Sequence, residues 1–452
     1  MAGLSLALIE RDWIDPLHVA AGLEGIEGRL ILLSDGGPNA RWSYVAAGPL
    51  RLERIPNGAP DPFARISGLL GDPAPPAPPD APPFTGGVVG LASYDLAAPT
   101  ATLGGDDQDW PGLTLARHEA VLAFDHHRKR VVAVGRGEDT VDAAAAADRA
   151  SDWLVRAQAP QTTLAPLAEA FTPDRSAQAY RDAVADVVRR IAEGEIFQAN
   201  IARAWSGALK PETDPFDLFV RLAGASPAPY AAFWDLGDHV LASNSPESFL
   251  SLRDGWITAR PIKGTRPRGA TPVEDDALKA ELLASAKDRA ENLMIVDLMR
   301  NDLSRVCVPG SVTAPALFDL QTFANVHHLV STVRGRPAPG AGPARVMAAT
   351  FPPGSITGAP KHQAMQVIAR HEAARGPWCG SLFLAGSDGS LEASVLIRTV
   401  ALRRAADGWR FRTLAGAGIV ADSDPAAELA ETDAKIASIR RALMDQFASC
   451  TL

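Results

Sequence analysis

Cysteine is scarce in this 452-residue chain, and long hydrophobic runs are absent from it. The three cysteines, Cys307, Cys379 and Cys450, lack the short spacing of metal ligands and form an odd, sparse set typical of free thiols in a reducing compartment. The first apolar run, Leu4–Ile9, is too short for the apolar core of a signal peptide, and no later run is long enough to span a bilayer. We therefore expect a cytoplasmic protein with no membrane partner.

An excess of positive charge is also missing. Lysine and arginine number 44 against 53 aspartates and glutamates, and the net charge of −9 argues against nucleic acid or an anionic membrane as the main partner. An anionic small substrate is still allowed, but it needs arginines and lysines gathered locally. Hydrophobic content of 46% and charged content of 21% are those of an ordinary globular protein, and the length predicts two domains or one large composite domain.

Residues 1–160 have a mostly β pattern, because short apolar runs alternate with turns. A tract rich in proline and alanine, Asp72–Pro83, cannot join the interior of a sheet and predicts an exposed, extended loop. A helix is predicted at Ala143–Val155, and Ala157–Pro173 has the composition of a linker. The predicted strands contain Leu30–Leu33, Tyr44–Ala47, Gly87–Leu91, Val121–Phe124 and Val131–Val134.

The second part of the chain opens with an amphipathic helix and a strand. Apolar residues recur at helical spacing over residues 180–191, and Gly194 predicts the end of the helix. In the strand Glu195–Trp205, Gln198 and Asn200 share one face, and the other face carries Phe197, Ala199 and Ile201. The two amides line a polar pocket or lie on an exposed face, and the strand alone does not distinguish these alternatives.

Lys263 stands in the segment Pro261–Gly269, beside a glycine and two arginines. Crowding by the guanidinium groups of Arg266 and Arg268 disfavours the ammonium form, and a neutral lysine is a nucleophile. The same composition is also that of a solvated basic turn.

Several carboxylates have two readings. Glu247 follows a strand-like run and is either a general acid, if burial raises its pKa, or an ordinary turn carboxylate. The helix predicted at Lys287–Arg305 is largely buried, so its carboxylates need partners. A second helix begins at Asp424–Pro425, with the aspartate as its cap. Glu291, Glu428 and Glu431 from these two helices either hold a divalent cation such as Mg²⁺ or form surface salt bridges.

Two glycine-rich stretches favour the close approach of a ligand. Gly354–Lys361 leads into a helix near Pro360, so its backbone N–H groups suit an anion, although the spacing is not that of a P-loop. Gly416 and Gly418 bracket the second stretch. Arg398 ends a strand-like run and offers a guanidinium to a carboxylate. His327 and His328 are an ionisable pair in apolar surroundings, an arrangement found more often in cores or on surfaces than in catalysis.

Together these segments resemble the chorismate-utilising enzymes: the large subunits of anthranilate synthase and aminodeoxychorismate synthase, with isochorismate and salicylate synthases as relatives. The resemblance implies an α/β (α+β) fold like that of anthranilate synthase component I, with large antiparallel sheets packed as a sandwich and helices outside. It also implies an N-terminal region at 1–160, matched more weakly, and a chorismate-binding catalytic domain at 170–447. The matching stretches keep the family order and are Glu195–Arg203, Ser245–Glu247, Pro261–Gly269, Glu291–Val306, Val326–Val333, Gly354–Ala364, Trp378–Ser381, Ile397–Thr399 and Gly416–Lys435.

Three positions favour the aminodeoxychorismate branch. Isochorismate and salicylate synthases carry a lysine base where this chain has Gln198, and an amide cannot deprotonate an attacking water. Anthranilate synthases typically have alanine at the position of Lys263, whereas aminodeoxychorismate synthases have lysine, and Trp378–Ser381 also matches that branch. Phe383 and Glu392 depart from common family residues. The alternatives are anthranilate synthase component I and a non-catalytic protein that binds chorismate or tryptophan.

The resemblance assigns roles to individual residues. It implies a Mg²⁺-dependent, transaminase-class amination of chorismate at carbon 4 for para-aminobenzoate and folate synthesis, with ammonia from a separate glutamine amidotransferase subunit. Lys263 is the covalent nucleophile, Glu247 the general acid, and His328 matches a residue thought to assist pyruvate elimination in anthranilate synthases. Ser34 falls at a position of the family's tryptophan pocket. The metal ligands are Glu291, Glu428 and Glu431, and the substrate-binding residues are Gln198, Gly264, Thr265, Thr357, Gly358, Lys361, Trp378, Arg398, Gly416 and Lys435.

Overall fold

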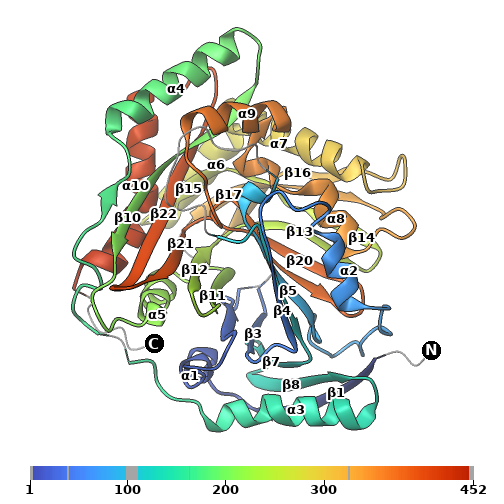
Figure 1. The fold of residues 1–452 in the computed structure, drawn as a ribbon. Helices are drawn as coiled ribbons and strands as arrows, with labels where there is room; N and C mark the ends of the chain where they lie inside the picture. Colours follow the sequence, from blue (N-terminus) through green and yellow to red (C-terminus); the bar gives the residue numbers. More distant parts are fainter. Residues whose placement is uncertain (1–3, 38–39, 98–109, 162, 324–325, 447–452) are drawn as a thin grey trace.

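The computed structural model describes residues 4–37, 40–97, 110–161, 163–323 and 326–446; Cys450 and residue 447, the predicted end of the second region, lie outside them. The predicted fold class is confirmed. Two large sheets, antiparallel at every pairing described, pack against each other with helices outside (Figure 1). None of the helices in these ranges is long and apolar enough to cross a membrane.

The larger sheet joins strands from both ends of the chain. Its order is β1-β8-β7-β3-β2-β11-β12-β21-β22-β10-β18, and β9 pairs with β10 outside this path. The strands are β1 Ser5–Asp12, β2 Leu30–Leu33, β3 Trp42–Ala46, β7 Ala120–Asp125, β8 Arg130–Gly137, β9 Thr172–Pro173, β10 Gln198–Ala208, β11 Tyr230–Asp235, β12 His239–Ser245, β18 Gly358–Ala359, β21 Thr399–Ala405 and β22 Gly408–Ile419.

The second sheet also joins strands from both ends of the chain. Its order is β15-β17-β14-β13-β20-β19-β5-β6-β4, and β16 pairs with β17. Because β2 pairs with β11 and β5 with β19, strands from residues 1–160 and from residues 170–447 share both sheets. The predicted boundary therefore does not separate two independent sheets. The strands are β4 Arg51–Ile55, β5 Gly87–Ala92, β6 Leu113–His118, β13 Ser248–Arg253, β14 Trp256–Ala259, β15 Ile262–Pro267, β16 Thr313–Thr322, β17 Val326–Gly335, β19 Ser381–Gly386 and β20 Leu391–Val395.

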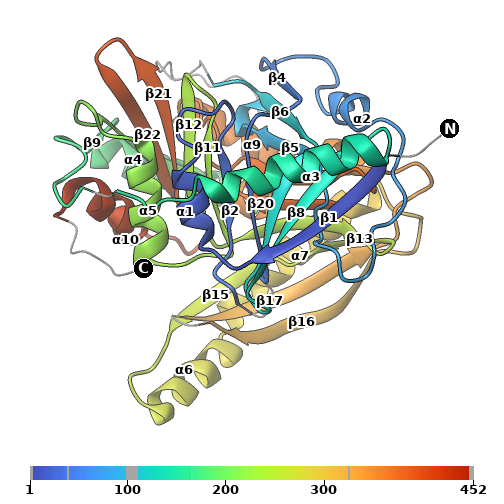
Figure 2. The ribbon, with the colours of Figure 1, turned by 90° about the horizontal axis from the view of Figure 1, so that it is seen from below.

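Apolar side chains from both sheets meet in a central core, which includes Leu30, Trp234, Leu91 and Leu382. Helices cover the outer faces: α3 lies across β1 and β8 (Figure 2), and α4 and α9 pack on β10 and β22. The helices are α1 Pro16–Ala21, α2 Ala64–Leu70, α3 Thr140–Val155, α4 Ala177–Ala192, α5 Pro215–Ala225, α6 Pro272–Ala284, α7 Ala286–Ser304, α8 Pro343–Thr350, α9 Lys361–His371 and α10 Pro425–Met444, with 3₁₀ turns η1 Tyr94–Leu96 and η2 Gly354–Ile356.

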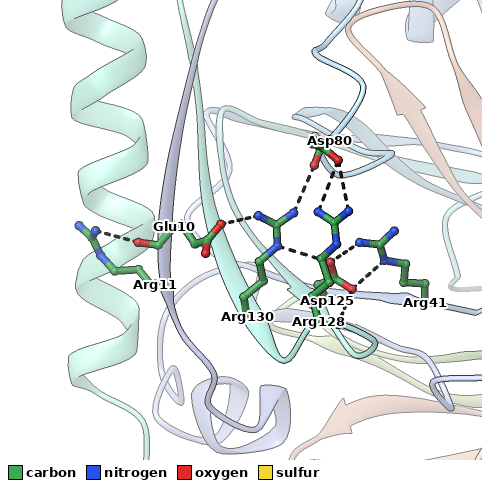
Figure 3. Close-up of polar contacts among 7 residues, drawn as sticks. All are labelled: Glu10, Arg11, Arg41, Asp80, Asp125, Arg128 and Arg130. Atoms are coloured by element: carbon green, nitrogen blue, oxygen red, sulfur yellow. Dashed lines mark hydrogen bonds and ion pairs between the residues drawn. The ribbon is translucent and has the colours of Figure 1, made fainter.

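The proline- and alanine-rich tract forms no helix or strand and is mostly exposed, and an ion-pair network ties it to the β7–β8 hairpin (Figure 3). Buried Asp125 accepts hydrogen bonds from Arg41 and Arg130, which hold its pKa at about 2, although burial acts against them. Arg128 and Arg130 also reach Asp80 of the tract. These arginines are paired with carboxylates, so the cluster holds a loop in place.

The predicted linker, Ala157–Pro173, is partly built into the fold. Leu167 and Ala168 are buried, and their backbone N–H groups donate to the Leu443 carbonyl of α10. Thr172 and Pro173 form β9 against β10. Proline and threonine content suggested a flexible connection, but the two apolar residues in its middle decide how the segment packs.

Candidate functional site

The polar face of β10 is buried, so the two amides do not lie on an exposed face. Gln198 and Asn200 are 1% and 9% exposed, and neither Gln198 Oε1 nor Asn200 Oδ1 has a hydrogen-bond partner in the described part of the chain. Phe197 precedes the strand and is 68% exposed, so it does not lie on the buried face of Ala199 and Ile201 as predicted. Two buried acceptors without donors are costly unless a ligand supplies the missing hydrogen bonds.

Glycines on β22 make room for these amides. Gly418 lies opposite Asn200 in the ladder; a Cβ there would stand 2.5 Å from Gln198 Nε2 and 3.9 Å from Lys263 Nζ. A Cβ on Gly416 would stand 2.7 Å from Asn200 Oδ1 and 3.0 Å from the Trp378 ring. The missing Cβ atoms therefore let the amides, Trp378 and Lys263 converge on one space.

A bulge in β15 sets the position of Lys263. Lys263 pairs with Leu329 of β17, and the register shifts before Thr265. Gly264 between them has a φ of +78°, a conformation that favours glycine. A Cβ there would also stand 2.9 Å from side-chain atoms of α6 and α7, namely Leu282 and Asp288. The glycine is thus required by backbone and packing together.

The pKa of Lys263 is lowered, as predicted, but the predicted cause is wrong. Arg266 pairs with Glu281 and Asp288, and Arg268 pairs with Asp275. Burial is the main reason that the Lys263 pKa falls; Glu247 and Glu291 act against it, and Lys435 adds to it. A lysine with this balance is a better nucleophile than an exposed one.

Glu247 has the environment of a carboxylic acid. Burial raises the pKa of its carboxyl, and the hydrogen bond from Ser355 and the charges of Lys263 and Lys435 partly offset the rise. Ser355 Oγ lies 2.7 Å from Glu247 Oε1. The backbone of Glu247 is held by Val395 N and Ser245 Oγ. The predicted Gly354–Lys361 loop therefore meets the carboxyl of Glu247 through the Ser355 hydroxyl, and Ser355 is a site residue that no single-segment pattern identified.

The three glutamates are electrostatically coupled. Burial raises the pKa values of Glu291 on α7 and Glu428 on α10, and Glu431 raises both further. In the described residues no group of three or more histidines, cysteines or carboxylates is close enough to hold a metal ion by itself. Glu431 pairs with Lys435 at 2.6 Å, and Glu428 accepts from Ser423 at 2.6 Å. The hard oxygen donors fit Mg²⁺, which keeps several waters, but they are not gathered into a closed shell.

Comparison with known proteins decides the family. A model described as chorismate binding enzyme matches residues 40–441. The chain belongs to the chorismate binding enzyme family. It is 38% identical over 360 residues to aminodeoxychorismate synthase component 1 of Klebsiella aerogenes, covering 78% of this chain and 76% of that protein. It is 35% identical over 441 residues to anthranilate synthase component 1 of Aeropyrum pernix, covering 95% and 93%.

Solved structures agree on the fold of this chorismate binding enzyme. Anthranilate synthase component I of Streptococcus pneumoniae TIGR4 matches with a TM-score of 0.76 at 28% identity, covering 90% of this chain and 94% of that one. The menaquinone-specific isochorismate synthase of Escherichia coli matches with a TM-score of 0.73 at 17% identity, covering 98% and 96%, which concerns the fold alone.

Lys361 is placed differently from its predicted substrate-binding role. Its Nζ lies 2.6 Å from Asp302 Oδ2 and 2.8 Å from the carbonyls of Thr350 and Pro352. Because an ammonium group has three protons, these contacts use all of them. Thr357 likewise donates to the carbonyls of Pro353 and Gly354. In this chorismate binding enzyme Lys361 therefore holds the loop under the pocket.

His327 and His328 separate into two environments. His327 is buried between Asp275 and Thr322, at 2.8 and 2.9 Å, which is a structural position. His328 Nδ1 lies 2.9 Å from Thr265 Oγ1, two residues after Lys263, and burial lowers its pKa. The neutral imidazole of His328 therefore lies beside β15, the strand that carries Lys263, the predicted nucleophile.

Trp378 and Lys435 lie beside Gly416, and Arg398 is close enough to His328 to lower its pKa. Arg398 is exposed, yet surrounding protein lowers its pKa, and within the described residues no carboxylate pairs with it. Trp378 is buried and lies 5.1 Å from the Arg375 guanidinium, while Lys435 Nζ donates to the Gly416 carbonyl at 2.9 Å. Arg398 thus offers an uncommitted guanidinium to an anion, and Lys435 supports the glycine-containing strand β22.

Gly358, a further predicted contact, approaches β10 so closely that a Cβ there would stand 2.2 Å from the Gln198 carbonyl.

Ser34 lies beside a second cavity between the two sheets. Ser34 accepts from Gly36 N, its hydroxyl donates to the Ala40 carbonyl, and its backbone N–H donates to Ser43 Oγ. The adjacent cavity measures about 230 Å³ and is lined by aromatic and apolar side chains with Arg253 and Glu392. Burial raises the pKa of Glu392 to about 7. The hydroxyl of Ser34 is committed to its own turn, so we retain the tryptophan pocket only as a prediction.

Proposed function

We propose that this chain is component I of an aminodeoxychorismate synthase, which aminates chorismate at carbon 4. The observation that carries the proposal is Lys263: a bulge aims it at the buried amide face, and burial lowers its pKa. Relatives named aminodeoxychorismate synthase component 1 are 37–39% identical to the chain. Gln198 offers no base to activate water, which favours amination over water addition.

Lys263 attacks carbon 2 through its neutral amine. The ring double bonds shift, the bond from carbon 4 to oxygen breaks, and Glu247 donates the proton that lets the oxygen leave as water. Ammonia then attacks carbon 4, the double bonds shift back, and the bond to Lys263 breaks. The Glu247 carboxylate takes the surplus proton from the new ammonium group, which restores the acid. The complete cycle returns Lys263 and Glu247 to their starting states.

Arg398 holds the enolpyruvyl carboxylate through its guanidinium, with Trp378 and Gly416 beside it. Glu291, Glu428 and Glu431 would hold Mg²⁺, in part through water, and the bound ion would supply positive charge to neutralise the ring carboxylate. The ammonia comes from a separate glutamine amidotransferase subunit, and the sparse free thiols favour a cytoplasmic setting.

The test is the identity of the product. The chain is incubated with chorismate, Mg²⁺ and an ammonium salt, and the products are separated by chromatography with and without an aminodeoxychorismate lyase. We expect a non-fluorescent amino compound that the lyase converts to para-aminobenzoate. Fluorescent anthranilate without the lyase would instead identify the second candidate, anthranilate synthase component I, which the match to the Aeropyrum pernix protein over 95% of the chain favours. Release of glutamate from glutamine by this chain alone would contradict the separate subunit.

A further inference from the structure

We propose that Ser355 is a positioning residue that decides which oxygen of Glu247 carries the transferable proton. The proposal rests on the proposed function only in taking Glu247 as the acid that protonates the departing oxygen of carbon 4. Ser355 itself needs no contact with the substrate, because it acts through Glu247.

The contact between Ser355 and Glu247 favours one of two arrangements of protons. Ser355 Oγ lies 2.7 Å from Glu247 Oε1 across 108 positions of the sequence. A serine hydroxyl has one proton to donate, and here it donates to Oε1. Oε1 is then an acceptor, so the acid proton of Glu247 resides on Oε2, the oxygen left free for the substrate. Without the serine, either oxygen can take the proton, and only one is in line with the leaving group.

Hydrogen bonds hold the backbone around Ser355 and Glu247 in place. The turn η2 is fixed where Thr357 Oγ1 donates to the Pro353 carbonyl at 3.0 Å and where Arg375 Nη1 donates to the Ile356 carbonyl at 3.3 Å. Val395 N donates to the Glu247 carbonyl at 3.0 Å. These bonds fix the backbone on both sides of the 2.7 Å contact between the hydroxyl and the carboxyl.

The charged groups that face Glu247 make this control useful. Lys263 on β15 and Lys435 on α10 favour its carboxylate, and burial favours its acid form. The Cys379 thiol also lies near, but burial raises its pKa, so it stays neutral. The hydrogen bond from the Ser355 hydroxyl stabilises the carboxylate form of Glu247. It therefore limits the rise of the Glu247 pKa and lets one group both release and regain a proton.

The experiment compares three variants. Ser355→Ala removes the donor, Ser355→Thr keeps it, and Ser206→Ala is a matched control, because Ser206 Oγ donates to Asp174 at 2.7 Å on the surface. The pH profile of kcat/KM for chorismate with saturating ammonium salt is measured for each, and thermal unfolding shows which are folded. Loss of the carbon 4 oxygen is common to the para and ortho products, so the comparison can be read whichever product forms.

We expect Ser355→Ala to lower kcat about tenfold or more with KM for chorismate nearly unchanged. The limb of its pH profile that reports Glu247 should move upward by about one pH unit, because the Glu247 carboxylate loses a hydrogen bond. The other limb should stay in place. Ser355→Thr should restore both kcat and the limb, and Ser206→Ala should move neither. A folded Ser355→Ala variant with an unshifted profile, or an Ser355→Thr variant as impaired as Ser355→Ala, would overturn the proposal. Ortho product from the wild type would overturn the proposed function and leave this one standing.

Discussion

Replacing Lys361 by methionine separates a structural lysine from a substrate ligand. The change removes the ammonium group but keeps a side chain of similar length. Asp302 then loses its partner at 2.6 Å in a buried position, and the carbonyls of Thr350 and Pro352 lose their donor. Breaking a buried pair by removing one partner costs about 3–5 kcal/mol, so we expect a fall of that size in the free energy of unfolding.

Urea unfolding, followed by tryptophan fluorescence and circular dichroism, measures the loss. Lys279→Met is the control, because Asp275 keeps Arg268 and His327 when Lys279 is removed, and we expect it to cost less than about 1 kcal/mol. Adding Asp302→Asn to Lys361→Met should restore part of the stability, because no carboxylate is then left unpaired. Unchanged unfolding of Lys361→Met together with a raised KM for chorismate would refute the argument and return Lys361 to the substrate.

Three further predictions concern the chemistry and the second cavity. Lys263→Arg should be inactive because guanidinium stays protonated. Residual product of Lys263→Ala should shift from para to ortho, and full para activity of this variant would contradict the role of Lys263 as nucleophile. Intact-mass measurement of wild type with chorismate alone should show an adduct on Lys263. A chelator should abolish activity and Mg²⁺ should restore it; activity that survives excess chelator would exclude Glu291, Glu428 and Glu431 as ligands. The Glu392 pKa of about 7 lies above that of the unfolded chain, so stability should fall as pH rises from about 4.5 to 7. In urea unfolding, Glu392→Gln should therefore be more stable than wild type by roughly 2–3 kcal/mol at pH 8 but not at pH 4.5. The control Glu138→Gln, at an exposed position, should show no such difference.

The elements that the sequence predicted well are those with a local cause. The apolar run of β2 was found with its observed bounds, Leu30–Leu33, and its first two residues are buried. Helix α10 begins where Asp424 accepts from Ala426 N and Ala427 N with Pro425 in the first turn, as predicted from two adjacent residues. Such features depend on neighbours in the chain, which a single sequence contains.

What could not be predicted depends on residues distant in the chain. Spacing indicates that Lys263 lies beside arginines, but only the fold shows that Glu281 and Asp275 neutralise them. Lys361 looked like an anion ligand because Asp302, its partner across 59 positions, is invisible to local patterns. The same holds for Ser355 and Glu247, since no periodicity relates an η2 hydroxyl to a carboxyl that follows β12.

The sharing of strands between the two sheets bears on how the chain reaches its fold. Strand β5 emerges early in synthesis, yet one of its neighbours, β19, is made only near the end of the chain, and β2 waits until the middle of the chain for β11. Pairings between such distant segments are slow to form, so the apolar edges of β2 and β5 stay open while the rest of the chain is synthesised. Residues 1–160 made alone should therefore aggregate, and the nascent enzyme should depend on chaperones for longer than one built from locally paired hairpins.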